Sequence, residues 1–168
     1  AYAASFLHAL LSNDVLALHD GQGLYATYLT PQGRLIADMV VYHCGDYLLL
    51  DVAPGQAAPL AARFDQAIFS EDVRIGDVSG TVDQLGVIGP AAAEVVARVT
   101  SADVDSLRAL PVRSHLVAGD VRIARTDDAR LPSLDVFFPA AARSALIARL
   151  AEAGAVELSA DLVEALRI

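Results

Sequence analysis

The sequence contains no lysine and no tryptophan, and it contains a single cysteine. One cysteine excludes an internal disulfide framework and a metal cluster held by cysteines alone. All 12 basic residues are arginine, and the 21 acidic residues bring the formal net charge to −9 at pH 7. Because protein surfaces that bind nucleic acids are basic, this acidic balance argues against DNA as a partner.

Long hydrophobic runs are also missing, although 55% of the residues are hydrophobic. A membrane-spanning helix needs about 18 or more consecutive apolar residues, and no run of that length occurs. The N-terminus also lacks the basic region and apolar run of a signal peptide. We therefore expect no membrane partner, and the cytoplasm is the simplest compartment for a chain with so little cysteine.

The usual sequence signals of metal and nucleophile sites are absent. The four histidines (His8, His19, His43 and His115) are not spaced like metal ligands. No G-x-S-x-G motif is present, so a serine nucleophile of the hydrolase type has no support. We expect no metal site.

Apolar periodicity predicts alternating helices and strands along the chain. The predicted helices cover residues 4–12, 54–69, 91–99 and 139–153, with a short helical piece within 101–110 and a last segment at 160–168. The predicted strands cover residues 24–30, 34–42, 47–52, 73–78, 84–88, 112–117, 121–126 and 134–138.

The second half of the chain resembles the first. Residues 3–15 align with residues 92–104 at an offset of 89 (92 − 3 = 89), and helices open at both Pro54 and Pro139. Matching elements in matching order indicate an internal duplication. We predict an α+β fold of two ferredoxin-like β-α-β-β-β-α units with antiparallel sheets, one over residues 1–80 and the other over 81–168.

The repeat also predicts segments outside this chain. A strand at 84–88 precedes the helix of the second half, whereas no strand precedes the helix at 4–12. The last helical segment reaches Ile168 without a stop signal. We therefore expect the domain to be truncated at both ends, with the first strand of the first half missing.

One stretch, residues 30–42, combines a tight-turn signal with an apolar strand that carries a lone carboxylate, Asp38. Two interpretations remain open. Asp38 is either a strand carboxylate paired with Arg34 or a backbone N–H, or a ligand contact that accepts hydrogen bonds from N–H donors.

Four phrases of the sequence resemble a known superfamily: FLHALLSNDV, LYATYLTPQGRLIADMVVY, DYLLLDV and LGVIGPAA. It is the folate-binding superfamily of the glycine-cleavage T-protein, an aminomethyltransferase, and the YgfZ-like proteins. The resemblance implies two ferredoxin-like halves with tetrahydrofolate, or a derivative of it, in a channel between them. It implies that Asp38 contacts the folate and that Leu48 and Leu50 lie against its rings; ordinary core packing is the alternative for both leucines.

The two branches of this superfamily differ at positions that can be compared here. The T-protein carries a DD pair, of which Asp38 matches the second member and Ala37 replaces the first. Its GYTGE-G segment is absent from residues 125–132, and an arginine of its ARD phrase falls at Val163. These departures favour the YgfZ-like branch, whose KGCYxGQE segment would lie beyond Ile168.

The resemblance therefore leads us to predict a tetrahydrofolate-binding, YgfZ-like protein that is not itself an enzyme. It implies a role in the assembly or maintenance of Fe–S enzymes, which would be partners, or in folate-linked tRNA modification. The alternative is an aminomethyltransferase that moves a one-carbon unit from a lipoyl-bound aminomethyl group to tetrahydrofolate, with Asp38 as the catalytic residue. A second alternative is a degenerate domain that binds only proteins.

Overall fold

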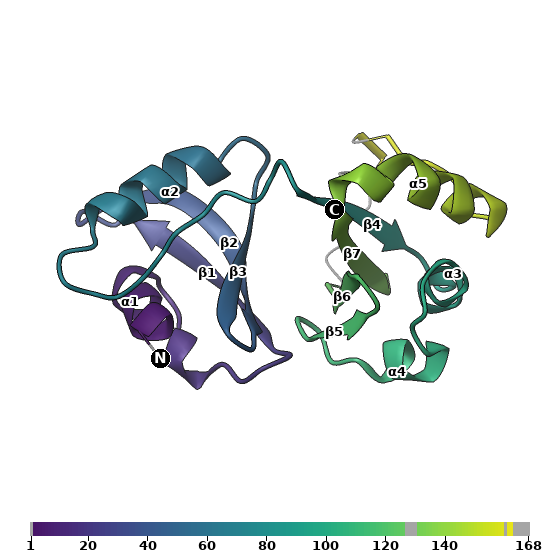
Figure 1. Cartoon of the computed structure of the whole chain (residues 1–168), viewed down its shortest axis with the longest axis horizontal. Helices are drawn as coiled ribbons and strands as arrows, with labels where there is room; N and C mark the ends of the chain where they lie inside the picture. Colours follow the sequence, from purple (N-terminus) through teal and green to yellow (C-terminus); the bar gives the residue numbers. More distant parts are fainter. Residues whose placement is uncertain (1, 127–130, 160, 163–168) are drawn as a thin grey trace. The chain divides into compact units, whose positions relative to one another are not determined.

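The computed structural model describes residues 2–126, 131–159 and 161–162. The chain divides into two compact units, Ala1–Ser79 (unit 1) and Gly80–Ile168 (unit 2). Each unit combines an antiparallel sheet with helices (Figure 1). The predicted α+β class with antiparallel sheets is confirmed. In the part of the chain that the structure describes, no helix has the length and apolar character needed to cross a membrane.

Unit 1 is built around a three-stranded meander with β2 in the centre. Its elements in order are α1 (Tyr2–Leu10), the 3-10 helix η1 (Val15–Ala17), β1 (Gly23–Leu29), β2 (Leu35–Cys44), β3 (Tyr47–Val52) and α2 (Ala57–Gln66). Gly45 and Asp46 form the two-residue turn between β2 and β3, and Gly45 has a φ of +71°. Glycine adopts this conformation without the strain that a β-carbon would add, so the turn fixes the β2–β3 register.

The core of unit 1 lies between one face of this sheet and the two helices. Phe64 of α2 is only 1% exposed and occupies the centre of the core. Its ring packs edge-on against Phe6 of α1, with centroids 6.4 Å apart, and lies 5.2 Å from the ring of Tyr28 in β1. The β2 residues that face this core are Ala37, Met39 and Val41.

The outer edge of β1 is closed by the segment that follows α1. Ser12 donates its N–H to the Thr27 carbonyl at 3.0 Å, and its Oγ accepts from the Thr27 N–H at 2.9 Å. The Asn13 side chain donates from Nδ2 to the Tyr25 carbonyl at 2.8 Å. Short polar side chains thus satisfy strand groups that would otherwise lack partners.

Unit 2 has a four-stranded sheet in the order β4-β7-β6-β5. Its elements are β4 (Val82–Ile88), α3 (Ala92–Val99), α4 (Val104–Ala109), β5 (His115–Ala118), β6 (Val121–Arg125), β7 (Ser133–Pro139), the 3-10 helix η2 (Ala140–Ala142) and α5 (Arg143–Glu152). Helices α3 and α5 contribute to one buried core with the sheet, centred on Val96, Ile123 and Val136. Asp103 caps α4 by accepting from the Ser106 N–H at 2.8 Å.

The two units repeat the same meander. Leu50-Asp51-Val52 of β3 recurs as Leu134-Asp135-Val136 of β7, at an offset of 84 (134 − 50 = 84). Asp51 lies opposite Val40 of β2, and Asp135 lies opposite Ala124 of β6. Strands β1, β2 and β3 therefore correspond to β5, β6 and β7. Strand β4 has no counterpart among the described residues of unit 1.

One predicted strand is wrong, and one predicted helix cannot be compared in full. Residues 73–78 form no strand. Val73 and Ile75 pack against the unit 1 core, so the alternating pattern there reflects an extended segment that lies on the core without pairing. Of the predicted helix at 160–168, residues 160 and 163–168 lie outside the described residues.

Phe64→Ala should destabilise unit 1 by about 3–5 kcal/mol, because it leaves a cavity among tightly packed rings. Phe69→Ala is the matched control, since Phe69 is 91% exposed, and it should change stability by no more than about 0.5 kcal/mol. Urea unfolding followed by circular dichroism measures both. Equal effects of the two substitutions would contradict the assigned core.

Candidate functional site

Asp38 lies in the middle of β2, on the face of the sheet that is turned away from the unit 1 core. Ala37 and Met39 on either side of it are buried, and Asp38 is exposed, because successive side chains of a strand point to opposite faces. Tyr25 of β1 lies opposite Val40 and is thus a diagonal neighbour of Asp38. Its hydroxyl donates to Oδ2 of Asp38 at 3.0 Å.

The partner of Asp38 differs from both partners that the sequence suggested. Within the described residues, Asp38 hydrogen-bonds the Tyr25 hydroxyl and neither Arg34 nor a backbone N–H. An ionised carboxylate accepts through two oxygens, and no described residue donates to Oδ1. Asp38 therefore keeps acceptor capacity for a ligand that carries N–H donors.

Leu48 and Leu50 lie on the opposite face of the sheet from Asp38. Both pack, partly buried, against the unit 1 core, together with Val52. The structure thus does not bring them together with Asp38 on one face. Their contact with folate stays a prediction, and their packing favours the alternative of ordinary core residues.

Two β3 residues that sequence reasoning passed over share the face of Asp38. Asp51 lies opposite Val40, and Leu49 lies opposite Tyr42. The signal that could have identified them is the two-residue turn at 45–46. That turn pairs even-numbered residues of β2 with odd-numbered residues of β3, so the faces follow from the turn length.

Ala37 stands where the T-protein carries the first aspartate of its DD pair. This replacement affects the face that carries Asp38 less than the sequence suggested. Ala37 is 7% exposed and faces the core beside Met39 and Val41. A carboxylate at position 37 would point into that apolar core. Its absence therefore removes no charge from the face that carries Asp38.

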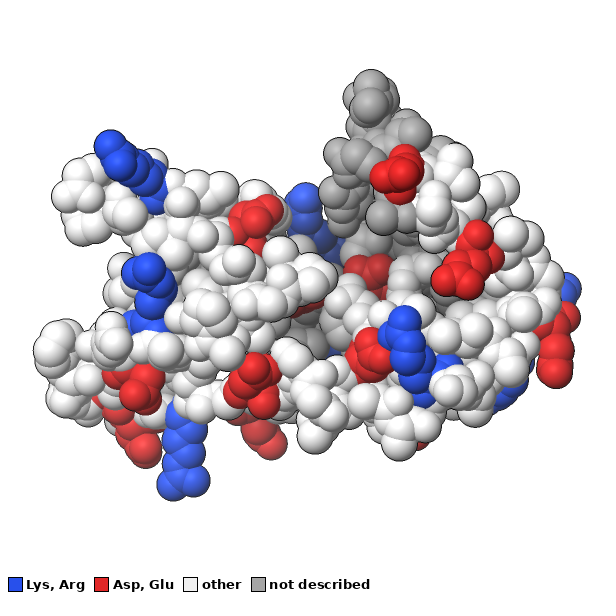
Figure 2. All heavy atoms as spheres, turned by 90° about the horizontal axis from the view of Figure 1, so that it is seen from above, with Lys and Arg blue, Asp and Glu red and all other residues white. Residues whose placement is uncertain are grey.

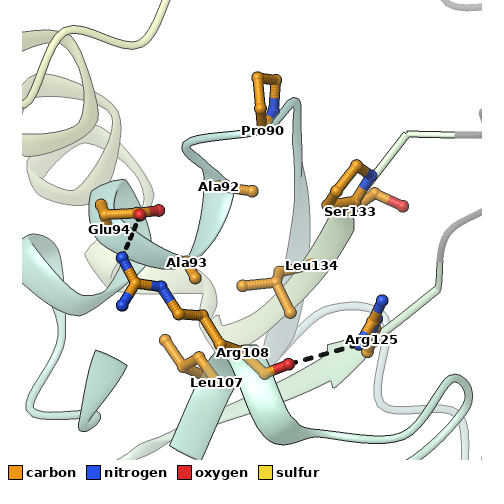
Figure 3. Close-up of a pocket in the computed structure, with 10 residues that line it drawn as sticks. Pro90, Ala92, Ala93, Glu94, Leu107, Arg108, Arg125, Ser133 and Leu134 are labelled. Atoms are coloured by element: carbon orange, nitrogen blue, oxygen red, sulfur yellow. Dashed lines mark hydrogen bonds and ion pairs between the residues drawn. The ribbon is translucent and has the colours of Figure 1, made fainter. Parts of the chain in front are cut away.

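A pocket in unit 2 is a second candidate site (Figure 3). Its apolar walls come from Ala92 and Ala93 at the start of α3, Leu107 of α4 and Leu134 of β7. Arg108 and Arg125 are its basic residues. Pockets of this kind suit a small ligand only when their polar groups converge on the space.

The basic groups of this pocket are engaged in holding unit 2 together. Arg108 pairs with Glu94 of α3 at 2.5 Å and with Asp105 at 3.2 Å. Arg125 donates to the Leu110 carbonyl at 3.0 Å, at the end of α4. The hydrogen bond from Arg108 is the largest cause that lowers the pKa of Glu94. These contacts hold α3, α4 and β6 together, and they engage both arginines of the pocket within the protein. The face that carries Asp38 is therefore the stronger candidate site.

The other charged side chains of the described residues form no third candidate site. On the face shown in Figure 2, the acidic and basic side chains lie in small groups separated by uncharged surface. Within the described ranges, no three or more His, Cys, Asp or Glu residues are grouped so that they could hold a metal ion. The replaced GYTGE-G region at 125–132 falls partly on residues 127–130, and those lie outside the described residues, as does Val163.

Arg108→Gln should raise the pKa of Glu94 toward its ordinary value, because the guanidinium lowers it in the native protein. A lowered native pKa stabilises the fold above the ordinary pKa of the group, and this contribution is lost as the pH falls through the lowered value. The substitution should therefore reduce stability at neutral pH and not in strong acid. NMR titration of the Glu94 carboxyl measures its pKa, and urea unfolding at neutral pH and in strong acid measures the stability. Arg149→Gln is the control. An unchanged Glu94 titration would contradict the pairing.

The chain resembles known proteins in sequence and in structure. The family model described as the GCVT N-terminal domain matches residues 1–159. An aminomethyltransferase of Bacillus subtilis is 35% identical over 106 residues, which cover 62% of this chain and 29% of that protein. An aminomethyltransferase of Rubrobacter xylanophilus is 28% identical over 163 residues, which cover 96% of this chain and 44% of that protein.

Solved structures share the fold. The crystal structure of glycine cleavage system aminomethyltransferase T from Bartonella henselae has a TM-score of 0.86 at 21% identity, over 99% of this chain and 45% of that chain. A chain of the heterotetrameric sarcosine oxidase of Corynebacterium sp. U-96 has a TM-score of 0.63 at 21% identity, over 95% of this chain and 78% of that chain. The chain spans less than half the length of the aminomethyltransferases that it matches. With a family model that covers residues 1–159, the chain belongs to the family of the GCVT N-terminal domain.

Proposed function

We propose that the chain is the tetrahydrofolate-binding domain of a protein of the aminomethyltransferase type. The observation that carries this proposal is Asp38, an exposed carboxylate that projects from the middle of β2 and is oriented by the Tyr25 hydroxyl. The family match and the relatives that bear the name aminomethyltransferase support the same function.

The residues around Asp38 fit the chemistry of a reduced folate. Its pterin ring is flat and partly apolar, and its edge carries N–H donors. The face of β2 and β3 offers a carboxylate acceptor in Asp38, a hydroxyl in Tyr25 and apolar surface in Val40 and Leu49. Small-ligand sites commonly combine an apolar surface with a few polar groups of this kind.

Asp38 has two tasks in this proposal. Its carboxylate accepts a hydrogen bond from an amine N–H of the ligand, and it can take up the proton of that amine as a general base. Bound tetrahydrofolate would supply the amine nitrogens that receive a one-carbon unit. Tyr25 positions the carboxylate by its hydrogen bond to Oδ2.

A YgfZ-like role without catalysis is the second candidate. The observation that favours it is the absence of the GYTGE-G pattern from residues 125–132. The buried position of Ala37 weakens the other argument for this branch, because an aspartate there would face the core. The names of the matched relatives support the aminomethyltransferase reading better, so we place it first. The roles in Fe–S enzyme maintenance and tRNA modification belong to the second candidate.

Calorimetry with tetrahydrofolate tests the binding site. Asp38→Ala should weaken binding about 10- to 100-fold, because a hydrogen bond to a charged group contributes about 1.5–3 kcal/mol. Tyr25→Phe should weaken it less. Asp65→Ala, an exposed aspartate on α2, is the matched control and should bind like the native protein. Undiminished affinity of Asp38→Ala would refute the anchor, and the absence both of heat and of competition by folinic acid would refute folate binding.

A second assay separates the two candidates. Aminomethyl transfer from a lipoyl carrier protein to tetrahydrofolate should be detectable, and Asp38→Asn should lower kcat by about 10²–10⁴, because the amide cannot act as a base. Folate binding without any turnover would reject the aminomethyltransferase reading and support the YgfZ-like one.

A further inference from the structure

The hydrogen bond that orients Asp38 depends on where β1 places Tyr25. The Tyr25 hydroxyl reaches Oδ2 of Asp38 along a diagonal between β1 and β2, at 3.0 Å. The Tyr25 side chain is 42% exposed, so packing fixes its ring less firmly than it would fix a buried ring. The position of the Tyr25 backbone therefore bears directly on where the hydroxyl lies.

The Tyr25 backbone is held from outside the sheet. Ser12 bonds both backbone groups of Thr27, so these groups face the outer side of β1. Amide groups alternate sides along a strand, and Tyr25, two residues earlier, thus also turns its carbonyl away from β2. This carbonyl accepts from Nδ2 of Asn13 at 2.8 Å. Asn13 therefore holds the residue that orients Asp38.

Asn13 is itself fixed on both sides. Its Oδ1 accepts from the Asp14 N–H at 2.8 Å, and its carbonyl accepts from the Val15 N–H at 3.0 Å. Val15 is fully buried in the unit 1 core, and Ser12 is bonded to β1. Because its backbone is anchored before and after it, the side-chain amide of Asn13 meets Tyr25 in a defined geometry.

Unit 2 builds the corresponding turn without an asparagine. Residues 12–15, Ser-Asn-Asp-Val, recur as residues 101–104, Ser-Ala-Asp-Val, at an offset of 89 (101 − 12 = 89). Each run leads into a helix, η1 in unit 1 and α4 in unit 2. Ala102, the counterpart of Asn13, has no side-chain donor. A turn of this kind therefore does not require the amide.

The strand residues that follow explain why unit 1 has the amide. His115 stands at the position of Tyr25 and Arg122 at that of Asp38, because the paired strands repeat in the same register. His115 Nδ1 also lies 2.7 Å from Nη1 of Arg122, but His115 is only 6% exposed. Burial holds the ring in unit 2, whereas the exposed Tyr25 is held through its backbone.

We propose that Asn13 is a positioning residue for Asp38 and that it acts through Tyr25. By holding the Tyr25 carbonyl, Asn13 keeps β1 where the hydroxyl meets Oδ2 of Asp38, so that Oδ1 is presented to an N–H of the ligand. This inference rests on the proposed function, in which Asp38 contacts tetrahydrofolate, and it adds no direct contact between Asn13 and the ligand. Asn13 should then affect affinity only while the Tyr25 hydroxyl is present.

Calorimetry with tetrahydrofolate on the 168-residue chain tests this route. Asn13→Ala should weaken binding about two- to tenfold, the range of one neutral hydrogen bond. In a Tyr25→Phe background the same substitution should cause no further loss, because the hydroxyl that Asn13 positions is already gone. Ser12→Ala is the matched control, since it removes the side-chain contact of the same turn with Thr27 and should leave affinity unchanged.

NMR of the chain labelled with ¹³C at the tyrosine Cζ gives a readout that needs no folate. Asn13→Ala should move the Tyr25 resonance toward its position in Asp38→Ala, where the hydroxyl has lost this acceptor. Ser12→Ala should leave the resonance in place. A purely structural role of Asn13 would lower the stability of unit 1 without this selective change.

Three results would overturn the proposal. Unchanged affinity in Asn13→Ala would show that the contact does not serve the site, and an equal loss with and without the Tyr25 hydroxyl would show another route. An unmoved Tyr25 resonance in Asn13→Ala, or an equal shift in Ser12→Ala, would show that Asn13 does not position the hydroxyl. If the native chain binds no tetrahydrofolate, the proposed function fails, and the resonance alone decides whether Asn13 positions Tyr25.

Discussion

The pleat of the unit 1 sheet is the constraint on which the rest of this unit depends. Ala37, Met39 and Val41 must face the core around Phe64, and the residues between them must then face the other way. The two-residue turn at 45–46 carries this choice into β3 without slippage. A one-residue shift would place Asp38 in the apolar core, where an unpaired carboxylate is costly.

The same constraint determines what each face can do. One face of the sheet packs against helices α1 and α2 and forms the unit 1 core. The other face carries Asp38, which is exposed, and Tyr42, which is fully buried. Asp38 can therefore be polar without cost to packing. Tyr25 adds a donor that the core does not need. Family membership suggests a chemical role for Asp38, and the pleat explains why a carboxylate at this position lies outside the apolar core.

The sequence predicted most of the fold because most of its signals are local. Strand β3 was predicted at its observed bounds, since a turn residue precedes it and apolar residues fill it. The false strand at 73–78 shows the limit of such signals, because extended segments on a core alternate in the same way. The partner of Asp38 could not be predicted, since a diagonal contact with Tyr25 needs the register of two strands. The family resemblance predicts that Leu48 and Leu50 contact the ligand, whereas the pleat of β3 turns their side chains toward the unit 1 core.

The pairing of β4 with β7 has a consequence for the order of folding in unit 2. Ile88 and Ser133 lie opposite each other although 45 positions separate them in the chain (133 − 88 = 45). Closing such a loop costs entropy that the short turns of the β5-β6-β7 meander do not. We expect the meander to form first and β4 to dock last. Before that step, unit 2 would have a three-stranded sheet in the order that the described strands of unit 1 show.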